Sequence, residues 1–450
     1  MAPTQNGRLI FNQVPTGYPE PGKTTVYDTS SAIDLDNVPL NGSVLLKTLV
    51  LSADPYLRGR MRDAKEKSYN LAFTLGEPIS GFGIGVVLRS EHPDFTAGDH
   101  VRGRLSFEEY SIPPEASIST LKKIVKEPEL GWEVYVGATG MPGMTAYCAW
   151  KEYSQAKKGE TVFISGGAGA VGVIVIQLAK QDGMKVIASA GTDEKVQECR
   201  EMGADVAFNY KTTDTAEVLE KEGPLDVYWD NVGGPTLDAA LGASAKHARF
   251  IICGMISTYN NKDGTNLKNL WTIFGRSLHI HGFLFSDLAP KYEKEFFDII
   301  PKKIARGELK HREDITRGLE HAGEALLDVQ IGRNFGKKGL FLNAILIDFD
   351  LPLSSLLCPD PLRFLVNQAL SDDDNDEFEV VIYDATDGFS EKPALIQQQK
   401  EEPNQYWWLR RPANLMLAFL YPNFGNDLYA TPSKKRSEEC FLSNVLELFI

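Results

Sequence analysis

One stretch constrains the fold of this chain more than any other. Between residues 161 and 180 a buried strand, a glycine turn and a helix follow one another, and Gly167, Gly169 and Gly172 have the spacing G-x-G-x-x-G. Such a turn brings backbone N–H groups and a helix N-terminus up to a pyrophosphate. The spacing alone is a weak signal, but a strand before it and a helix after it are the context that the motif requires. The sequence therefore predicts a dinucleotide-binding site.

The next strand indicates which dinucleotide binds. NAD-specific sites place an acidic residue near the end of this strand to hold the ribose 2′-OH. Here the strand ends in Ala190-Gly191-Thr192, and Lys195 follows within one helical turn. A lysine can meet a 2′-phosphate as a point charge. The pattern favours NADPH over NADH, although Lys195 could also be an ordinary exposed helix lysine.

The chain divides into three parts by pattern. Residues 1–142 are β-rich, whereas residues 143–304 alternate between strand and helix, which is typical of a parallel, doubly wound α/β sheet. Helices are predicted at 290–309 and 314–328. Residues 346–450 form an extension of unknown structure with a formal charge of −10. The predicted strands of the alternating part are 161–165, 185–190, 204–210, 226–231, 249–255 and 278–285.

Composition excludes several classes of protein. The net charge of −14 argues against nucleic-acid binding, which needs a basic surface. The five cysteines are scattered and lack a C-x-x-C pair, so they suggest a reducing compartment and no metal framework. We see neither a secretory signal nor an apolar run long enough to cross a membrane. A cytoplasmic protein with no membrane partner is expected.

Several short stretches of the chain, in order, are typical of one family. They are Leu51-Ser-Ala-Asp-Pro-Tyr-Leu-Arg58, Gly140-Met-Pro-Gly-Met-Thr-Ala-Tyr147, the glycine turn, Ala190-Gly-Thr-Asp-Glu-Lys195, Asn209-Tyr-Lys211, Asp230-Asn-Val-Gly-Gly234, Cys253-Gly-Met-Ile-Ser-Thr-Tyr-Asn260 and Gly282-Phe283. Together they resemble the zinc-independent medium-chain dehydrogenase/reductases, and within them the NADPH-dependent alkenal/one double-bond reductases, which include prostaglandin reductase and leukotriene B4 12-hydroxydehydrogenase. The similarity covers roughly residues 8–338 and implies a GroES-like substrate domain from residues 1–142, completed by about 305–345, and a Rossmann domain at 143–304. A homodimer is expected from the resemblance only.

Zinc-dependent relatives hold a catalytic metal with Cys, His and Glu ligands. This chain has Leu75-Gly-Glu-Pro78 where those relatives have a Gly-His-Glu motif. His279 and His281 share one face of a strand but have no third ligand nearby, so we predict no metal site. Without a Lewis acid to polarise an alcohol or carbonyl, ordinary alcohol oxidation is the less expected chemistry.

The resemblance also implies which residues hold the cofactor. In it Lys195 and Tyr210 bracket the 2′-phosphate, and Asn334 binds the nicotinamide amide. Simpler roles stay open: Tyr210 could be a strand-end tyrosine, Asn231 a turn residue, and Cys253 a packing residue whose backbone matters. The implied cofactor set is Gly169, Ala170, Val171, Gly172, Lys195, Tyr210, Asn231, Cys253, Gly254, Ser257, Tyr259, Phe283, Leu284, Phe285 and Asn334.

The implied reaction is hydride transfer from NADPH to the β-carbon of an α,β-unsaturated aldehyde or ketone. Charge then builds on the carbonyl oxygen and needs a preset donor. Tyr259 is the first candidate, because a phenol with a pKa near 10 is protonated at neutral pH, although it could only pack beside the cofactor. Tyr56 is the second donor or a pocket wall. Its segment could equally be a plain turn, with Arg58 paired to an acid.

Two other functions remain open. One is an NADPH quinone reductase with a wider cleft, and the other is a catalytically weak NADPH-binding protein that docks a partner through residues 346–450. The resemblance also weakens at the end of the return segment. Gly339 and Asn343 are expected to interrupt the strand that should close the substrate domain, because strand interiors disfavour both residue types.

Overall fold

The computed structural model describes residues 3–261 and 264–342, together with two short strands farther along the chain. The chain divides into two units, Met1–Ala344 and Ile345–Ile450. In the second unit β18 (Val381–Ile382) pairs antiparallel with β19 (Ala394–Leu395). The functional residues predicted from the sequence all fall in the first unit.

A six-stranded parallel sheet forms the centre of the alternating part. Its strand order is β12-β11-β10-β13-β14-β15, which is the doubly wound order of dinucleotide-binding folds. The predicted α/β class is therefore confirmed. In this order β10 and β13 are neighbours, and ligands bind where the strand order reverses between them. The strands are β10 (Thr161–Ile164), β11 (Lys185–Ala190), β12 (Val206–Asn209), β13 (Leu225–Asp230), β14 (Ser244–Ile252) and β15 (His279–Gly282).

Alternate residues of the inner strands enter two different apolar cores. Val162 and Ile164 of β10 pack in one core, and Phe163 between them packs in the other. Strand β13 repeats the pattern with Trp229 and Tyr228. Because both faces of the sheet are covered, these strands are continuous apolar runs rather than alternating ones.

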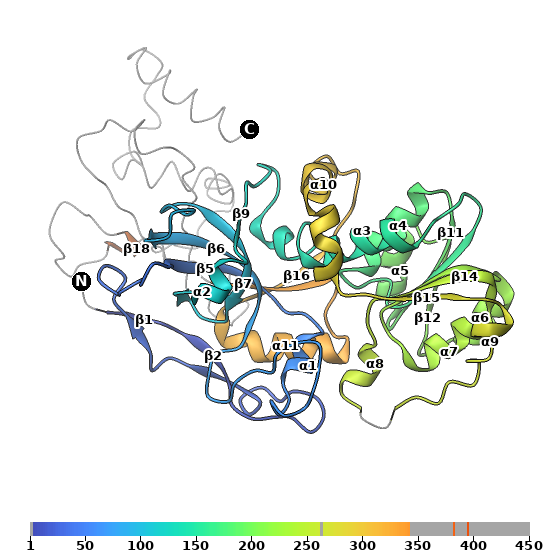
Figure 1. The fold of residues 1–450 in the computed structure, drawn as a ribbon, viewed down its shortest axis with the longest axis horizontal. Coiled ribbons are helices and arrows are strands. Elements are labelled where there is room, and N and C mark those ends of the chain that lie inside the picture. The colour runs from blue at the N-terminus through green and yellow to red at the C-terminus, as the bar shows by residue number, and fades with distance from the viewer. Residues whose placement is uncertain (1–2, 262–263, 343–380, 383–393, 396–450) are drawn as a thin grey trace, which may run out of the picture. The chain divides into compact units, whose positions relative to one another are not determined.

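Helices cover both faces of this sheet, as Figure 1 shows. The long helix α10 packs on α3, which in turn packs on α4. Helix α10 begins at Phe285 and ends at Ala305, so the helix predicted at 290–309 exists but lies earlier in the chain. The helices of this part are α3 (Met141–Tyr153), α4 (Gly172–Gln181), α5 (Asp193–Glu201), α6 (Thr215–Glu222), α7 (Gly234–Gly242), α8 (Ile256–Tyr259), α9 (Thr272–Gly275) and α10 (Phe285–Ala305).

A second sheet forms the β-rich part, with the order β16-β17-β5-β6-β7-β9 and with β8 paired to β5. Two small pairs, β1 with β4 and β2 with β3, lie beside it. The elements are β1 (Thr4–Gln5), β2 (Arg8–Phe11), β3 (Thr25–Asp28), β4 (Ala32–Ile33), β5 (Val44–Ser52), α1 (Leu57–Arg60), β6 (Ser80–Ser90), β7 (His100–Ser106), β8 (Tyr110–Ser111), α2 (Glu115–Ile118), β9 (Lys122–Lys123) and η1 (Trp132–Val136).

The return segment differs from the sequence prediction. The helix expected at 314–328 is wrong in its first part, because β16 (Glu313–Arg317) pairs in parallel with β17 (Lys337–Phe341). Gly318 then takes a left-handed φ of 86°, and η2 (Leu319–His321) and α11 (Ala322–Ile331) follow. The partner strand is far away in sequence, so local periodicity could not indicate it.

The closing strand also forms, contrary to the expectation that Gly339 would interrupt it. Strand β17 pairs antiparallel with β5 and completes the second sheet. A Cβ on Gly339 would lie 2.8 Å from Cδ1 of Ile315, so the glycine permits close packing against β16. Leu326 and Leu340 are buried in the same apolar core as Leu46. Figure 1 shows the orange return segment beside the blue strands. Asn343 lies outside the described residues.

Candidate active site

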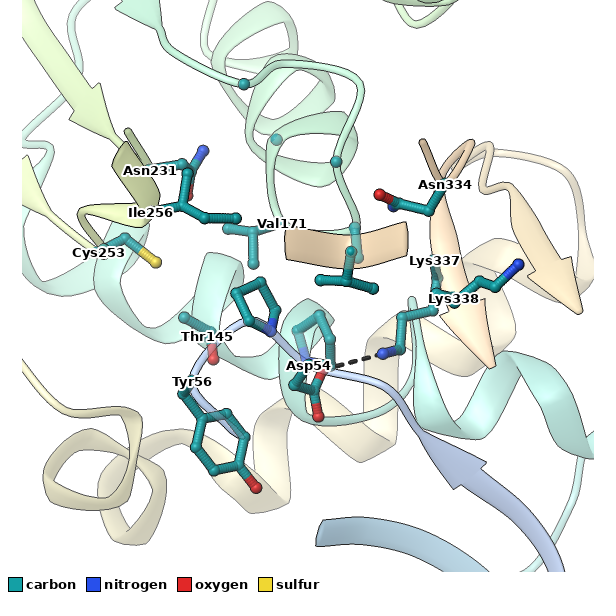
Figure 2. A pocket seen from close by; sticks show the side chains of 18 of the residues that line it. Asp54, Tyr56, Thr145, Val171, Asn231, Cys253, Ile256, Asn334, Lys337 and Lys338 are labelled. Carbon is teal, nitrogen blue, oxygen red and sulfur yellow. Dashed lines mark hydrogen bonds and ion pairs between the residues drawn. The ribbon is translucent and has the colours of Figure 1, made fainter. Parts of the chain in front are cut away.

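A cavity of about 420 Å³ lies where the ends of the parallel strands face the β-rich part. Figure 2 shows Val171 between Asn231 and Cys253 on one side and Asn334 on the other, with Tyr56 below. The cavity is lined by the glycine turn, by segments after the parallel strands and by the return segment. It therefore joins all the segments in which the sequence predicted site residues.

The glycine turn forms one wall of the cavity. Gly169, Ala170, Val171 and Gly172 line it, and α4 begins at Gly172. A Cβ on Gly172 would lie 2.6 Å from the carbonyl oxygens of Gly166 and Gly167. Only glycine lets the helix start so close to the turn, and the exposed backbone fits a pyrophosphate.

One end of the cavity carries positive charge. Lys195 and Lys211 line it together with Tyr210 and Gly191. The Lys195 ammonium donates to the carbonyl of Gly332 over 2.7 Å, and burial followed by the charge of Lys211 lowers its pKa. A 2′-phosphate would meet two lysines at this end. The sequence reasoning did not select Lys211, although it falls in a motif that carried the resemblance.

The turn after β13 is shaped by Asp230 rather than by Asn231. The buried Asp230 carboxylate accepts from the backbone N–H of Gly233 over 2.7 Å and from the Tyr228 hydroxyl over 2.7 Å. Burial raises the pKa of Asp230. Asn231 lines the cavity, but its amide donates to the Ser165 carbonyl over 2.7 Å. The Asn231 side chain therefore fixes the loop at the cavity edge.

The segment after β14 lines the inner part of the cavity. Cys253, Gly254 and Tyr259 all face it. Burial raises the pKa of the Cys253 thiol to about 12, so it is no nucleophile at neutral pH. Burial also raises the pKa of Tyr259 to about 12. Its hydroxyl accepts from the N–H of Met255 over 3.4 Å, so its own proton stays available to a ligand.

The opposite wall is aromatic. Tyr56, Phe82 and Phe285 line the cavity, with ring centroids 6.4 Å apart for Tyr56 and Phe82 and 5.5 Å apart for Phe82 and Phe285. The Tyr56 hydroxyl is buried and has no hydrogen-bond partner among the described residues. Burial, followed by the charge of Asp54, raises its pKa. An unpaired buried donor costs free energy, which a bound ligand could recover.

A buried ion pair holds this wall to the return segment. The Lys337 ammonium lies 2.9 Å from Asp54, and each side chain is 3% exposed (Figure 2). The other carboxylate oxygen of Asp54 accepts from Ser52 over 2.6 Å. Arg58 donates to the side-chain oxygen of Asn260 over 2.8 Å and to the carbonyl of Gly17.

Comparison with known proteins identifies the family. A family model described as the N-terminal domain of oxidoreductase matches residues 8–121, and one described as zinc-binding dehydrogenase matches residues 170–302. A 2-alkenal reductase (NADP(+)-dependent) of Nicotiana tabacum is 40% identical over 74% of this chain and 96% of its own length. The chain belongs to the zinc-independent medium-chain dehydrogenase/reductases, in the alkenal and enone reductase group.

Two further relatives agree with this membership. A (+)-pulegone reductase of Mentha piperita is 38% identical over 66% of this chain and 87% of its own length. The crystal structure of CurA from Vibrio vulnificus in complex with NADPH superposes with a TM-score of 0.68 at 31% identity, over 75% of this chain and 99% of that chain. The predicted family and fold are thus confirmed.

Within this reductase fold most predicted site residues meet in one cavity. Phe283, Leu284, Phe285 and Asn334 line it, although the Asn334 amide donates to the Gly336 carbonyl over 2.8 Å. Ser257 is not among the lining residues, and its hydroxyl donates to the Val232 carbonyl over 2.6 Å. Residues that sequence reasoning missed include Lys211, Phe82, Arg104, Thr145 and Lys337.

The described residues contain no group of three or more His, Cys, Asp or Glu side chains that could hold a metal ion. The His279 and His281 rings stack with centroids 6.5 Å apart, and Tyr153 covers His281. Likewise, no helix in the described part of the chain has the length and apolar character needed to cross a bilayer.

Proposed function

We propose that this protein reduces the carbon–carbon double bond of α,β-unsaturated aldehydes or ketones with NADPH. One observation carries the proposal. A single cavity joins a groove that fits a dinucleotide and ends in Lys195 and Lys211 to an aromatic chamber with the hydroxyls of Tyr259 and Tyr56. A conjugated carbonyl compound is apolar apart from its oxygen and fits such a chamber.

The comparisons support this chemistry. The tobacco relative acts on 2-alkenals by name and is NADP-dependent, and the CurA crystal structure contains NADPH. NADPH, predicted from the sequence, is thereby confirmed as the cofactor, and an oxidoreductase as the class of enzyme. Residues 143–304 would hold the cofactor, and residues 1–142 with 305–345 would enclose the substrate.

NADPH supplies a hydride when bound. The residues of the chain position the substrate and stabilise the charge that develops on its carbonyl oxygen. We assign this role to Tyr259, whose raised pKa keeps the phenol protonated and able to donate. A proton added at the α-carbon completes the reduction, so that one hydride and one proton saturate the double bond.

Three other assignments stay proposals. Gly169 to Gly172 would hold the pyrophosphate, with Lys195, Lys211 and Tyr210 at the 2′-phosphate. Asn334 would reach the nicotinamide amide through its carbonyl oxygen, because its NH₂ group is used by Gly336. A homodimer in the cytoplasm is expected from the resemblance and the composition, and it can be tested by the size of the purified protein and by its cellular location.

The deciding experiment follows NADPH oxidation with 2-octenal and identifies the product. Octanal supports the proposal, because the double bond has been reduced. An allylic alcohol would mean that the carbonyl is the hydride acceptor and would overturn it. A simple quinone is run in parallel, and turnover of the quinone without turnover of the enal would favour the quinone reductase alternative.

A further inference from the structure

Arg104 lines the cavity beside the aromatic wall of Tyr56, Phe82 and Phe285. It stands on β7 directly opposite Phe82 of β6, and both residues line the cavity. Cross-strand neighbours point to the same face of a sheet. Among the described residues no hydrogen bond or ion pair joins the Arg104 guanidinium to another group. Arg104 is half-buried, and no carboxylate of the described residues forms an ion pair with it.

Arg102, two residues earlier on the same face of β7, is a paired arginine with which Arg104 can be compared. Its guanidinium lies 2.7 Å from the Glu293 carboxylate and 4.1 Å from the centroid of the Phe297 ring. It does not line the cavity. The two arginines therefore differ in place and in pairing: Arg102 lies outside the cavity and is paired with Glu293, whereas Arg104 lines the cavity and has no carboxylate partner among the described residues.

The surroundings of Arg104 add positive charge and no negative charge. Arg60 donates to the carbonyls of Leu71 and Ser80 and stacks on Phe73, so no carboxylate neutralises it. Burial, followed by the charge of Arg104, lowers the pKa of Arg60 to about 10. Asp54, the one acidic residue on the described lining, is already paired with Lys337.

The unpaired Tyr56 hydroxyl belongs to the same wall of the cavity. The Tyr56 ring lies 6.4 Å from the ring of Phe82, which is the cross-strand neighbour of Arg104, and all three residues line the cavity. The buried hydroxyl and the guanidinium together offer donors for two oxygen atoms. Phe82 and Phe285 continue from Tyr56 as an apolar wall. An apolar chain can lie along this wall with its polar end at Arg104.

We propose that Arg104 determines specificity by binding a carboxylate at the end of the substrate remote from the double bond, with the Tyr56 hydroxyl as a second donor. This inference rests on the proposed function, since it names the kind of enal or enone that the site prefers. A guanidinium fork matches the two oxygens of a carboxylate. A neutral carbonyl would leave the charges of Arg104 and Arg60 without compensation.

A matched pair of substrates tests the proposal. 8-Oxooct-6-enoic acid carries an enal and a terminal carboxylate, and its methyl ester differs only in lacking the charge. For the native protein kcat/KM should favour the acid by about tenfold or more, as expected for a charge-assisted hydrogen bond in a confined site. In Arg104→Met the ratio of kcat/KM for the acid to kcat/KM for the ester should fall close to one. In Arg104→Glu the ester should become the better substrate. Arg104→Lys should keep part of the preference for the acid.

Arg102→Met is the matched control, because it removes a guanidinium from the same strand outside the cavity. It should keep the preference for the acid. Thermal unfolding of each variant checks that the protein is folded. An equal acid-to-ester ratio in the native protein and in Arg104→Met would overturn the inference and leave the reductase function intact.

A binding measurement distinguishes a failure of the carboxylate site from a failure of the proposed reductase function. Loaded with NADP⁺, the protein cannot reduce either compound, so titration calorimetry reports binding alone. Tighter binding of the acid that is lost in Arg104→Met supports the carboxylate site even if neither compound is turned over with NADPH. Lack of turnover of both compounds would overturn only the reductase assignment, and equal binding of acid and ester would overturn the site.

Discussion

At the scale of single residues, the proposed function depends on the hydroxyls of Tyr259 and Tyr56 and on the ammonium groups of Lys195 and Lys211. Tyr259 is held at the turn after β14 by the Met255 N–H, with its own proton free. Tyr259→Phe should lower kcat for an enal by about a hundredfold or more, the usual contribution of a positioned proton donor. NADPH affinity should change little, since the ring remains. Stopped-flow turnover and NADPH titration measure the two effects.

Tyr153→Phe serves as the control, because Tyr153 stacks on His281 away from the cavity lining. Turnover by Tyr259→Phe at the native rate would remove Tyr259 from the mechanism. The pH profile gives a second test. The acting form is the protonated phenol, and burial raises its pKa to about 12. Activity should therefore not fall as the pH rises through 10, where an ordinary tyrosine would lose its proton.

A separate prediction concerns Lys195 and Lys211, which line the positively charged end of the cavity. Lys195→Ala and Lys211→Ala should each weaken NADPH binding by about tenfold or more, because each removes a charge from the 2′-phosphate. NADH, which lacks that phosphate, should bind almost as before. Lys221→Ala removes a lysine that is 82% exposed and serves as the control. Equal losses for NADPH and NADH would contradict the assignment of this end of the cavity.

The sequence could predict only part of this residue-level picture. Lys195 was predictable because it follows the end of β11 within one helical turn. The free state of Arg104 was not, since it depends on which carboxylates lie nearby after folding. The same holds for Tyr56, whose hydroxyl is buried in the folded protein and whose ring packs on Phe82, 26 residues away along the chain.

At the scale of elements the return segment shows where local patterns fail. The strand–helix alternation from β10 onward was predictable, because strands such as β10 and β11 are short, mostly apolar runs that a glycine turn or a helix follows. Strand β16 was not, because Glu313–Arg317 takes its conformation from pairing with β17. Gly339 weakens β17 by propensity, but pairing on both sides outweighs that loss.

The Asp54–Lys337 ion pair connects β17 to the segment that carries Tyr56. Removing one partner leaves a buried charge alone, so Lys337→Met should lower the free energy of unfolding by about 3–5 kcal/mol. Asp54→Asn with Lys337→Met should cost less than the two single losses combined. Lys123→Met removes an exposed partner of Asp99 and should cost about 1 kcal/mol or less. Urea unfolding measures the free energy of unfolding of each variant. Equal decreases for Lys337→Met and Lys123→Met would contradict a structural role for the Asp54–Lys337 pair.

At the scale of the whole molecule, the sheet of the β-rich part is completed by β17, which ends before residues 346–450 begin. Strand β17 ends at Phe341 and pairs with β5, and Leu342 is buried in the core of the β-rich part. The described residues that line the cavity run from Ala53 to Lys338. Removing residues 347–450 should therefore leave a folded reductase with native kcat/KM and an unchanged thermal midpoint.

A shorter truncation provides the control for this prediction. A chain ending at Ile331 lacks β17 and would expose Val50 and Leu51, which that strand covers in the native sheet. It should not fold. If the chain that ends at residue 346 is also insoluble, the extension contributes to the core. If it folds but turns over enals more slowly than the full chain, residues 347–450 contribute to turnover, and the prediction of an accessory extension is wrong.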